Sequence, residues 1–294
     1  MSTAQSTDHT MQRISYSAAP DRTALKWPHQ AKIALWVAPN IEHYEYAPEK
    51  IRVRDPWPRI LHPDILNYGV RDYGNRVGVW RLMEVFDRFK IPCTVSLSMS
   101  VLEMYPDIAN AMMQREYEFM SHGLYNTRYH WGLSAEEEMH SIEECQAIHQ
   151  RITGKKFRGW FSPAASNTLN TPDLVAKAGI DYLCDLYHDD QPTSIHVKEG
   201  RLISLPYSME INDSIAWRRG MEAEQFKQNI CDEFDTLYAE GGKVMNIAVH
   251  PFIMGQPHRI EQLAQAFEYI FSHDGVWCAT GSEIVDCYLQ QVSV

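Results

Sequence analysis

The sequence predicts an α/β fold, a distorted (β/α) barrel of about seven parallel strands. Apolar, β-rich runs alternate along the chain with segments of helical periodicity, which is typical of parallel strands covered by helices. The strand–helix pairs follow one another without a Gly/Ser/Pro-rich linker, and 294 residues are enough for a single barrel. We therefore expect a flexible N-terminal tail at residues 1–20 and one domain over residues 21–294.

The first half of the chain contains four predicted strands, at residues 32–38, 91–99, 118–121 and 157–162. The helices predicted between them cover residues 75–90, 105–115 and 134–153. The first helix has an i, i+3, i+4, i+7 apolar stripe from Val79 to Phe86. The third begins with the capping box Ser134-x-x-Glu137 and ends at Gly154.

The second half continues the pattern with one interruption. A short helix after Thr171-Pro172 leads to a strand at residues 181–185, and two short strands at 194–197 and 202–205 suggest an antiparallel excursion. The remaining elements are predicted, in order, as a helix at 222–239, a strand at 243–250, a helix at 259–272, a strand at 276–279 and a helix at 282–291.

Charge and composition exclude several classes of partner. A net charge of −11 disfavours nucleic acid and anionic membranes, and no apolar run is long enough to span a bilayer. The six cysteines are scattered without a CxxC pair, so the sequence predicts neither a disulfide framework nor a thiolate zinc site. With no signal peptide at the N-terminus, we expect a cytoplasmic protein.

Polar side chains follow several predicted strands directly, where the active sites of β/α barrels lie. Amide hydrolysis needs one group to deprotonate water and another to protonate the departing nitrogen, and a Glu and a His are adequate for both tasks. These candidates are Asn40 and Glu42 after the first strand, His122 and Asn126 after the third, Trp160 and Ser162 at the fourth, and His250 after the late strand.

The motifs in these positions resemble the allantoinase-like branch of the polysaccharide deacetylase superfamily. They occur in family order between Trp27 and Tyr288, and their combination is more specific than any single motif. The resemblance is carried by Asn40-x-Glu42, Arg71-Asp72-Tyr73-Gly74-Asn75-Arg76, Ser121-His122-Gly123, Gly159-Trp160-Phe161, Ser166-Asn167-Thr168, Asp189-Asp190-Gln191-Pro192, Leu205-Pro206-Tyr207 and His250-x-x-x-x-Gly255-x-Pro257-x-Arg259.

This resemblance implies roles for the strand-end residues. The parent deacetylases hold a metal with one Asp of a pair and two histidines, whereas Asn40-x-Glu42 stands at the first strand end here and Asn126 stands four residues after His122. An amide is a poor zinc ligand, so we expect no cofactor, with zinc on Glu42 and His122 as the alternative and Glu45, His43 and His130 as spare ligands.

Without a metal, side chains must activate the water. Glu42 is the expected base or substrate anchor, and His250 matches the histidine that the family uses as the acid. His122 and Asn126 would orient the amide and donate hydrogen bonds to the developing oxyanion. Asn40, Trp160, Ser162 and Arg71 complete the expected substrate-binding set, with local structural roles as the alternative for Arg71 and Trp160.

The function predicted is hydrolysis of a small cyclic amide, ureide or imide. In the allantoinases that this chain resembles, the fourth strand ends in Gly-Trp-Tyr-Thr-Gly-Arg. The corresponding segment here is Gly159-Trp160-Phe161-Ser162-Pro163-Ala164-Ala165, which lacks the arginine, so a less polar substrate than allantoin is expected. The alternatives are metal-dependent deacetylation of an N-acetylated sugar and a catalytically silent, ligand-binding barrel.

Two further expectations concern the surroundings of the site and the assembly. The insertion at residues 53–73, which contains three prolines and Trp57, is expected to cover the site or to form a subunit contact. The family branch is commonly oligomeric, so we expect a homo-oligomer, a dimer or tetramer, with a small molecule as the only other partner.

Overall fold

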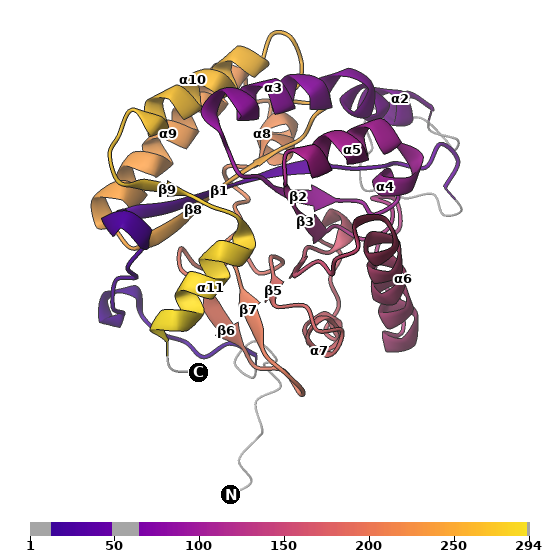
Figure 1. Cartoon of the computed structure of the whole chain (residues 1–294), viewed down its shortest axis with the longest axis horizontal. Helices are drawn as coiled ribbons and strands as arrows, with labels where there is room; N and C mark the ends of the chain where they lie inside the picture. Colours follow the sequence, from indigo (N-terminus) through magenta and orange to yellow (C-terminus); the bar gives the residue numbers. More distant parts are fainter. Residues whose placement is uncertain (1–12, 49–64, 293–294) are drawn as a thin grey trace, which may run out of the picture.

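The computed structural model of the chain describes residues 13–48 and 65–292. Its strands form one curled sheet in the order β6-β7-β5-β4-β3-β2-β1-β8, with β9 also paired to β1 (Figure 1). All pairs are parallel except β6 with β7. The strands are β1 (Ile33–Ile41), β2 (Thr94–Leu97), β3 (Glu118–Ser121), β4 (Gly159–Trp160), β5 (Tyr182–Leu183), β6 (Thr193–Ile195), β7 (Leu202–Ser204), β8 (Lys243–Val249) and β9 (Val276–Cys278).

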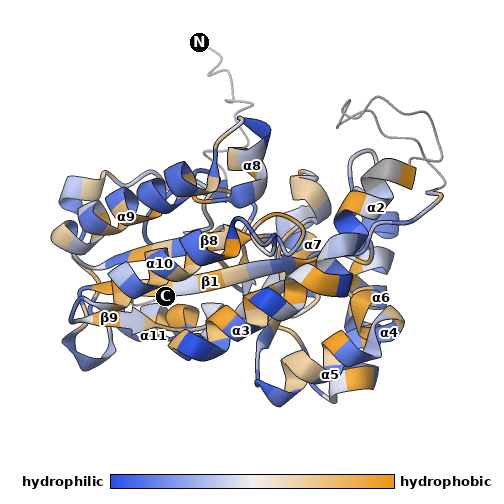
Figure 2. Ribbon diagram, turned by 90° about the horizontal axis from the view of Figure 1, so that it is seen from above, coloured by the Kyte–Doolittle hydropathy of each residue, from blue (hydrophilic) through white to orange (hydrophobic). Residues whose placement is uncertain are grey.

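Helices cover the outside of this half-barrel, and α3, α10 and α9 lie along β1 and β8 (Figure 2). The α-helices are α2 (Ile65–Tyr73), α3 (Val79–Phe89), α4 (Val101–Met104), α5 (Pro106–Gln114), α6 (Ala135–Thr153), α7 (Thr171–Lys177), α8 (Asp213–Arg218), α9 (Ala223–Glu240), α10 (Ile260–Phe271) and α11 (Gly281–Gln291). A π-helical turn, η3 (Gly74–Gly78), joins α2 to α3, and short 3₁₀ turns occur at η1 (Ala19–Asp21), η2 (Pro28–Gln30) and η4 (Pro163–Ala165).

Alternate residues of β1 belong to two layers of the core. Residues 33, 35 and 37 pack outward with side chains of the covering helices. Residues 34, 36 and 38 pack inward with side chains of the other strands, among them Met120, Tyr182 and Ile203. Because side chains of a strand alternate between its two faces, this parity decides which residues at each strand end can point into the mouth of the barrel.

Isolated hydrogen bonds, and not a strand ladder, bridge the two edges of the sheet. One of them is a backbone bond from the N–H of Ala248 on β8 to the carbonyl of Ile211, at 3.0 Å. Among the described residues, no backbone ladder joins β7 to β8. Trp36 Nε1 donates to the carbonyl of Pro206 at 3.0 Å, and the backbone N–H of Ser208 donates to Asn246 Oδ1 at 3.1 Å. We call this boundary between β7 and β8 the seam. The barrel is thus distorted and open on one side, as the sequence predicts.

The predicted elements are recovered with a few differences. β1 is longer than expected and ends at Ile41, and the first helix begins well before residue 75, because α2 and η3 precede α3. Residues 65–73 of the predicted insertion are therefore helical, while residues 53–64 lie outside the described residues. Helix α8 was not predicted, since six residues are too few to show a period.

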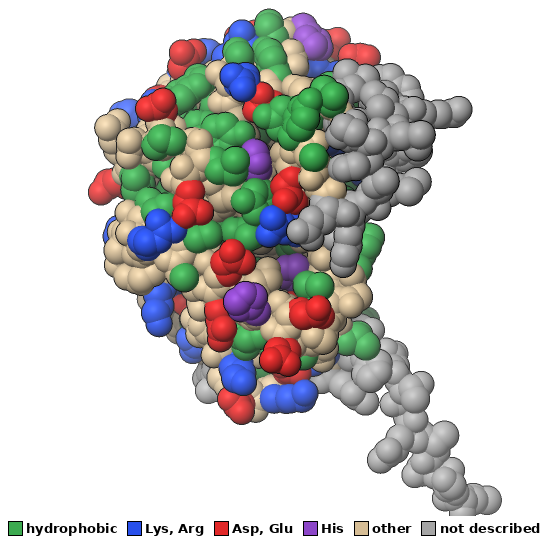
Figure 3. Space-filling model, turned by 90° about the vertical axis from the view of Figure 1, so that its right-hand side faces the viewer, with side chains coloured by type: hydrophobic (Ala, Val, Ile, Leu, Met, Phe, Trp, Pro, Cys, Tyr) green, Lys and Arg blue, Asp and Glu red, His purple; other side chains and the backbone are tan. Residues whose placement is uncertain are grey.

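The N-terminal segment is attached to the barrel from Arg13 onward, which differs from a flexible tail up to residue 20. Arg13 forms a bidentate ion pair with Asp173 at 2.6 and 2.7 Å and donates to the carbonyls of Leu169 and His196. Arg22 pairs with Asp189. No helix in the described part of the chain is long and apolar enough to cross a membrane. Acidic and basic side chains are interspersed on the face shown in Figure 3.

Candidate active site

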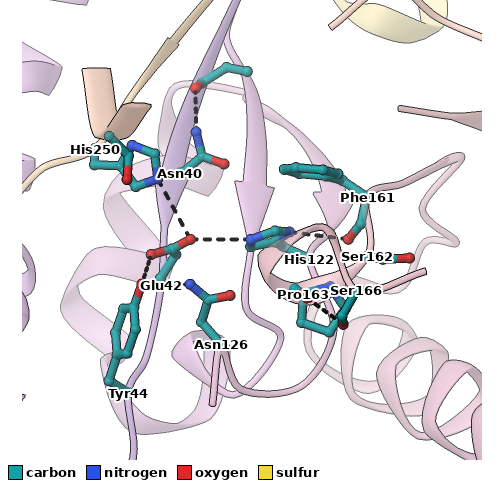
Figure 4. A network of polar contacts seen from close by, with 12 residues as sticks. Asn40, Glu42, Tyr44, His122, Asn126, Phe161, Ser162, Pro163, Ser166 and His250 are labelled. Carbon is teal, nitrogen blue, oxygen red and sulfur yellow. Dashed lines mark hydrogen bonds and ion pairs between the residues drawn. The ribbon is translucent and has the colours of Figure 1, made fainter. Parts of the chain in front are cut away.

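The three central side chains of the site follow the inward-facing residues of three strands. The inner stripe of β1 continues through Asn40 to Glu42, Met120 of β3 is followed two residues later by His122, and Ala248 of β8 by His250. All three groups therefore point into the same mouth, where Glu42, His122 and His250 are each less than one-tenth exposed (Figure 4).

Glu42 lies at the centre of a polar network. Its Oε1 lies 3.2 Å from His122 Nε2 and 3.7 Å from His250 Nε2, and its Oε2 accepts a 2.7 Å hydrogen bond from the Tyr44 hydroxyl (Figure 4). Burial alone would raise the pKa of Glu42, but the charges of His250 and His122 and the hydrogen bonds from His122 and Tyr44 lower it to about 2. Glu42 is therefore a carboxylate at neutral pH.

Asp213 holds His250 from the other side. The backbone N–H of His250 donates to Asp213 Oδ2 at 2.8 Å, and His250 Nδ1 lies 2.6 Å from Asp213 Oδ1. Burial would lower the pKa of His250, but the carboxylates of Asp213 and Glu42 outweigh it, and the pKa is raised. His250 is thus suited to carry and donate a proton.

Asp213 was missed by the sequence analysis. It begins the short helix α8 and follows no strand, so inspection of strand ends does not find it. A weak signal was present nonetheless, because Asn212-Asp213-Ser214 is a typical helix start and Asn212 caps α8 through the N–H of Ser214.

His122 lies between two hydrogen-bond acceptors. Its Nδ1 is 3.1 Å from the carbonyl oxygen of Phe161 and its Nε2 faces the carboxylate of Glu42. Neither acceptor can donate, so each contact is a hydrogen bond in which the ring nitrogen is the donor. The ring also stacks on Phe161, with centroids 4.5 Å apart. His122 is thereby presented as an N–H donor to the mouth.

Hydrogen-bond directions also fix the orientation of Asn126. The Tyr44 hydroxyl uses its one proton on Glu42, so its oxygen accepts from Asn126 Nδ2 at 2.6 Å. Asn126 Oδ1 then remains, buried and without a hydrogen-bond partner. Asn126 therefore offers an acceptor at the mouth, in addition to the donor role that the sequence predicts for its NH2 group.

Trp160 does not lie at the mouth. The ring of Phe161 packs in the inner layer, whereas Trp160 is fully buried in the outer layer and donates from Nε1 to Ser162 Oγ at 3.2 Å. The expected substrate contact of Trp160 is therefore absent here, because strand alternation turns residues 159 and 161 inward and residue 160 outward.

Ser162 is also fully buried and donates to a carboxylate. Its backbone N–H and its hydroxyl bond the two oxygens of Asp185, at 2.9 and 2.7 Å. Burial raises the pKa of Asp185 to about 6 although both bonds from Ser162 oppose it. Ser162 thus fixes the turn after β4 and does not present its hydroxyl to a substrate.

Asn40 and Arg71 each contact an aromatic side chain near Glu42. Asn40 and the Tyr207 hydroxyl exchange hydrogen bonds of 3.0 and 3.1 Å, so the amide of Asn40 orients an inner-layer aromatic ring. The Arg71 guanidinium lies over the ring of Tyr44, 4.6 Å from its centroid, and 5.5 Å from that of Phe252. Arg71 therefore places a positive charge beside the Tyr44–Glu42 pair.

Sequence comparisons define the class of protein. The family profile described as polysaccharide deacetylase matches residues 70–183. A predicted polysaccharide deacetylase of Schizosaccharomyces pombe is 31% identical, over 74% of this chain and 74% of that protein. A peptidoglycan deacetylase of Helicobacter pylori is 23% identical, over 78% of this chain and 89% of that protein. The chain therefore belongs to the polysaccharide deacetylase family.

Two solved structures are similar to this fold over most of their length. PuuE allantoinase superposes with a TM-score of 0.82 at 26% identity, over 91% of this chain and 94% of that one. A predicted polysaccharide deacetylase from Pseudomonas aeruginosa PAO1 gives a TM-score of 0.80 at 28% identity, over 92% and 95%. The family resemblance, the half-barrel and the assignment as a carbon–nitrogen hydrolase are thus confirmed.

The donors at the mouth do not fit the three-ligand metal site of the parent deacetylases. Within residues 13–48 and 65–292, no three His, Cys, Asp or Glu side chains are arranged to hold a metal ion. The third family ligand is replaced by the amide of Asn126, a poor ligand for zinc. The spare ligands are engaged elsewhere, with Glu45 on Thr127 and Arg128, His43 on Tyr105 and His130 beside Glu138.

Proposed function

We propose that this enzyme hydrolyses a carbon–nitrogen bond of a small cyclic amide, ureide or imide, with water activated by side chains. The observation that carries the proposal is the position of one carboxylate oxygen of Glu42 between Nε2 of His122 and Nε2 of His250. A base, an electrophile and an acid thus converge on one point, which is what hydrolysis of an amide requires. The likeness to PuuE allantoinase supports a cyclic substrate.

A substrate carbonyl would take the Nε2–H of His122 from Glu42. The bonds from His122 help to hold the pKa of Glu42 near 2, so their diversion to the carbonyl makes the carboxylate more basic when the substrate is in place. Glu42 then accepts a proton from water, whose oxygen attacks the carbonyl carbon. The oxyanion that forms is stabilised by His122.

His250 completes the reaction. As the carbon–nitrogen bond breaks, the nitrogen takes the proton of His250 Nε2, and the ring opens to a carboxylic acid with a free amide, urea or amine. After the product leaves, a water that enters the gap between the two groups passes the proton of Glu42 back to His250, which restores both groups. Asn126 Oδ1 is the acceptor that would bind the N–H beside the attacked carbonyl.

The experiment combines a substrate panel with matched variants. Allantoin, hydantoin, succinimide and N-acetylglucosamine oligomers are assayed before and after chelation, with metal content measured by elemental analysis. We expect ring hydrolysis that survives chelation, and a loss of kcat of about 10²- to 10⁴-fold in Glu42→Gln and His250→Gln. His149→Gln is the control, because His149 is equally buried but bonds the carbonyl of Lys155, on α6 away from the mouth.

The competing function gives the opposite result. Turnover of N-acetylglucosamine oligomers alone, with about one metal per chain and activity lost on chelation, would replace the proposal by metal-dependent deacetylation. The relatives described as deacetylases are the reason to include those substrates. A cytoplasmic location and assembly into a dimer or tetramer remain predictions from the sequence, and size measurements in solution test the assembly.

A further inference from the structure

We propose that Asn75 is a positioning residue, and that the π-helical turn η3 that carries it sets the separation between Glu42 and His250. The inference rests on the proposed function only in that Glu42 and His250 act in the hydrolysis, whatever the substrate. One short element contacts the chain on both sides of the reaction centre, at the end of β1 and after the end of β8.

On the β1 side, the contact is a hydrogen bond to the backbone of the catalytic carboxylate. Asn75 Nδ2 donates to the carbonyl oxygen of Glu42 at 2.8 Å, and Asn75 is 6% exposed. The ladder between β1 and β2 ends at Ile41, one residue earlier, so it does not hold Glu42. Without Asn75 this buried carbonyl would lose its partner. The next backbone anchor is one residue further on, where the carbonyl of His43 accepts from the N–H of Asn126 at 3.0 Å.

On the β8 side, the contact is backbone against backbone. A Cβ atom on Gly78 would lie 1.9 Å from the carbonyl oxygen of Pro251, and one on Gly74 would lie 2.8 Å from the backbone nitrogen of Phe252. These residues directly follow His250. Neither glycine has a positive φ, so the space itself requires them, and η3 and the turn after His250 can shift only together.

A second contact fixes the far end of that turn. Arg81, in the first turn of α3, donates from Nη1 to the carbonyl of Gly255 at 2.9 Å and to the Tyr73 hydroxyl at 2.6 Å. The segment after His250 is therefore held at both ends by the η3–α3 unit. Because π-helical turns insert one residue into a helix, they are frequent where a helix must meet a functional site.

The consequence concerns the gap between the two catalytic groups. Glu42 Oε1 and His250 Nε2 are 3.7 Å apart, which is beyond a good hydrogen bond although opposite charges attract. A rigid turn that bonds the Glu42 backbone and abuts the His250 segment prevents this pair from closing. The gap leaves room for a reacting group to approach both residues, and small displacements there are costly to the rate.

The test compares Asn75 with a matched buried asparagine. In Asn75→Ala, and in Asn75→Asp, which keeps the size but removes the donor, we expect kcat to fall about 10- to 100-fold while KM changes little. Asn246→Ala is the control: Asn246 is also buried and bonds the backbone of Trp36 and Ser208, but on the seam. Its loss should lower the melting temperature and leave kcat per folded molecule unchanged.

A crystal structure of each variant provides a readout that needs no substrate. We expect the Glu42 to His250 separation to change in Asn75→Ala and to stay the same in Asn246→Ala. Should Asn75→Ala not fold, Arg81→Gln removes the second contact more gently and should lower kcat in the same direction. Wild-type kcat and an unchanged separation in the variants of Asn75 and Arg81 would overturn the inference.

The test of Asn75 does not depend on which substrate the enzyme hydrolyses. If none of the rings is hydrolysed, the kinetic comparison uses whichever carbon–nitrogen substrate loses turnover in Glu42→Gln. In that case the proposed function fails while the inference is still decided. If the rings are hydrolysed and the variants of Asn75 match wild type in kcat and in structure, the inference alone fails.

Discussion

At the scale of single residues, the site couples the protonation of Glu42 to that of His250. Each charge shifts the pKa of the other, downward for the carboxylate and upward for the imidazole, and Asp213 adds to the upward shift. The free enzyme therefore holds a carboxylate and an imidazolium face to face. In the mechanism that we propose, substrate binding diverts His122 and so prepares Glu42 to accept a proton.

This coupling predicts the pH dependence. His250 must be protonated to act as the acid, and its raised pKa keeps it so above the ordinary value of 6.5, so kcat/KM should fall only as the pH rises through that raised value. In Asp213→Asn one of the two stabilising charges is lost, so the alkaline limb should move to lower pH and the rate at neutral pH should fall about 10- to 100-fold.

The control for this measurement is Asp173→Asn, which removes a carboxylate that pairs with Arg13 and Lys198 and does not contact His250. Its alkaline limb should coincide with that of wild type. An alkaline limb that stays in place in Asp213→Asn would show that Asp213 does not support the proton on His250.

Sequence reasoning found the strand-end residues because a barrel places them together whatever their partners are. Glu42, His122 and His250 each follow an inner-face residue by two positions, a relation visible in the sequence. The position of Asp213 depends on a short helix, and the outward direction of Trp160 depends on strand register. The orientation of the Asn126 amide depends on the proton of a hydroxyl group. No periodic pattern encodes those features.

At the scale of elements, close packing between strands determines where the barrel can tolerate change. β4 is only two residues long, yet its Gly159 faces the ring of Tyr182 on β5. A Cβ atom on Gly159 would lie 2.1 Å from Cζ of that ring. The Tyr182 hydroxyl donates in turn to Glu118 at 2.9 Å, and Glu118 also accepts from the N-terminus of α11.

Gly159→Ala should therefore destabilise the protein by about 1–3 kcal/mol, because the added methyl forces the Tyr182 ring from its place. Urea denaturation measures the loss, and adding Tyr182→Leu should recover part of it. Gly69→Ala is the contrasting case, since a Cβ on Gly69 in α2 meets no atom of the described residues within 4 Å. It should be neutral or slightly stabilising, and equal losses in both variants would refute the packing argument.

At the scale of the whole molecule, the N-terminal segment ties together parts of the chain that are distant in sequence. Arg13 bonds Asp173 on α7 and the carbonyls of Leu169 and His196, and the backbone of Lys26 bonds Gln291 at the end of α11. The segment thus fastens α7, the β6–β7 hairpin and α11 without approaching the mouth.

Arg13→Ala should lower the melting temperature by about 2–6 °C, because it removes a bidentate, partly buried network and leaves Asp173 with less support. The value of kcat should not change. Calorimetry tests this against Arg151→Ala, whose pair with Glu103 is exposed on both sides and should contribute little. A change in kcat without a change in melting temperature would contradict the fastening role.

We expect the barrel to open locally at the seam. Along most of the sheet, separating two strands means breaking a cooperative ladder. The seam is instead held by separate bonds, those of Trp36 and Asn246 and the backbone bond from Ala248 to Ile211, and these can break one at a time. Backbone amides beside the seam should therefore exchange with deuterium ahead of those shared by β1 and β8. If the substrate is the ring that we propose, we expect a bulkier ring to be accommodated on this side, while the strands that carry Glu42 and His250 stay in register.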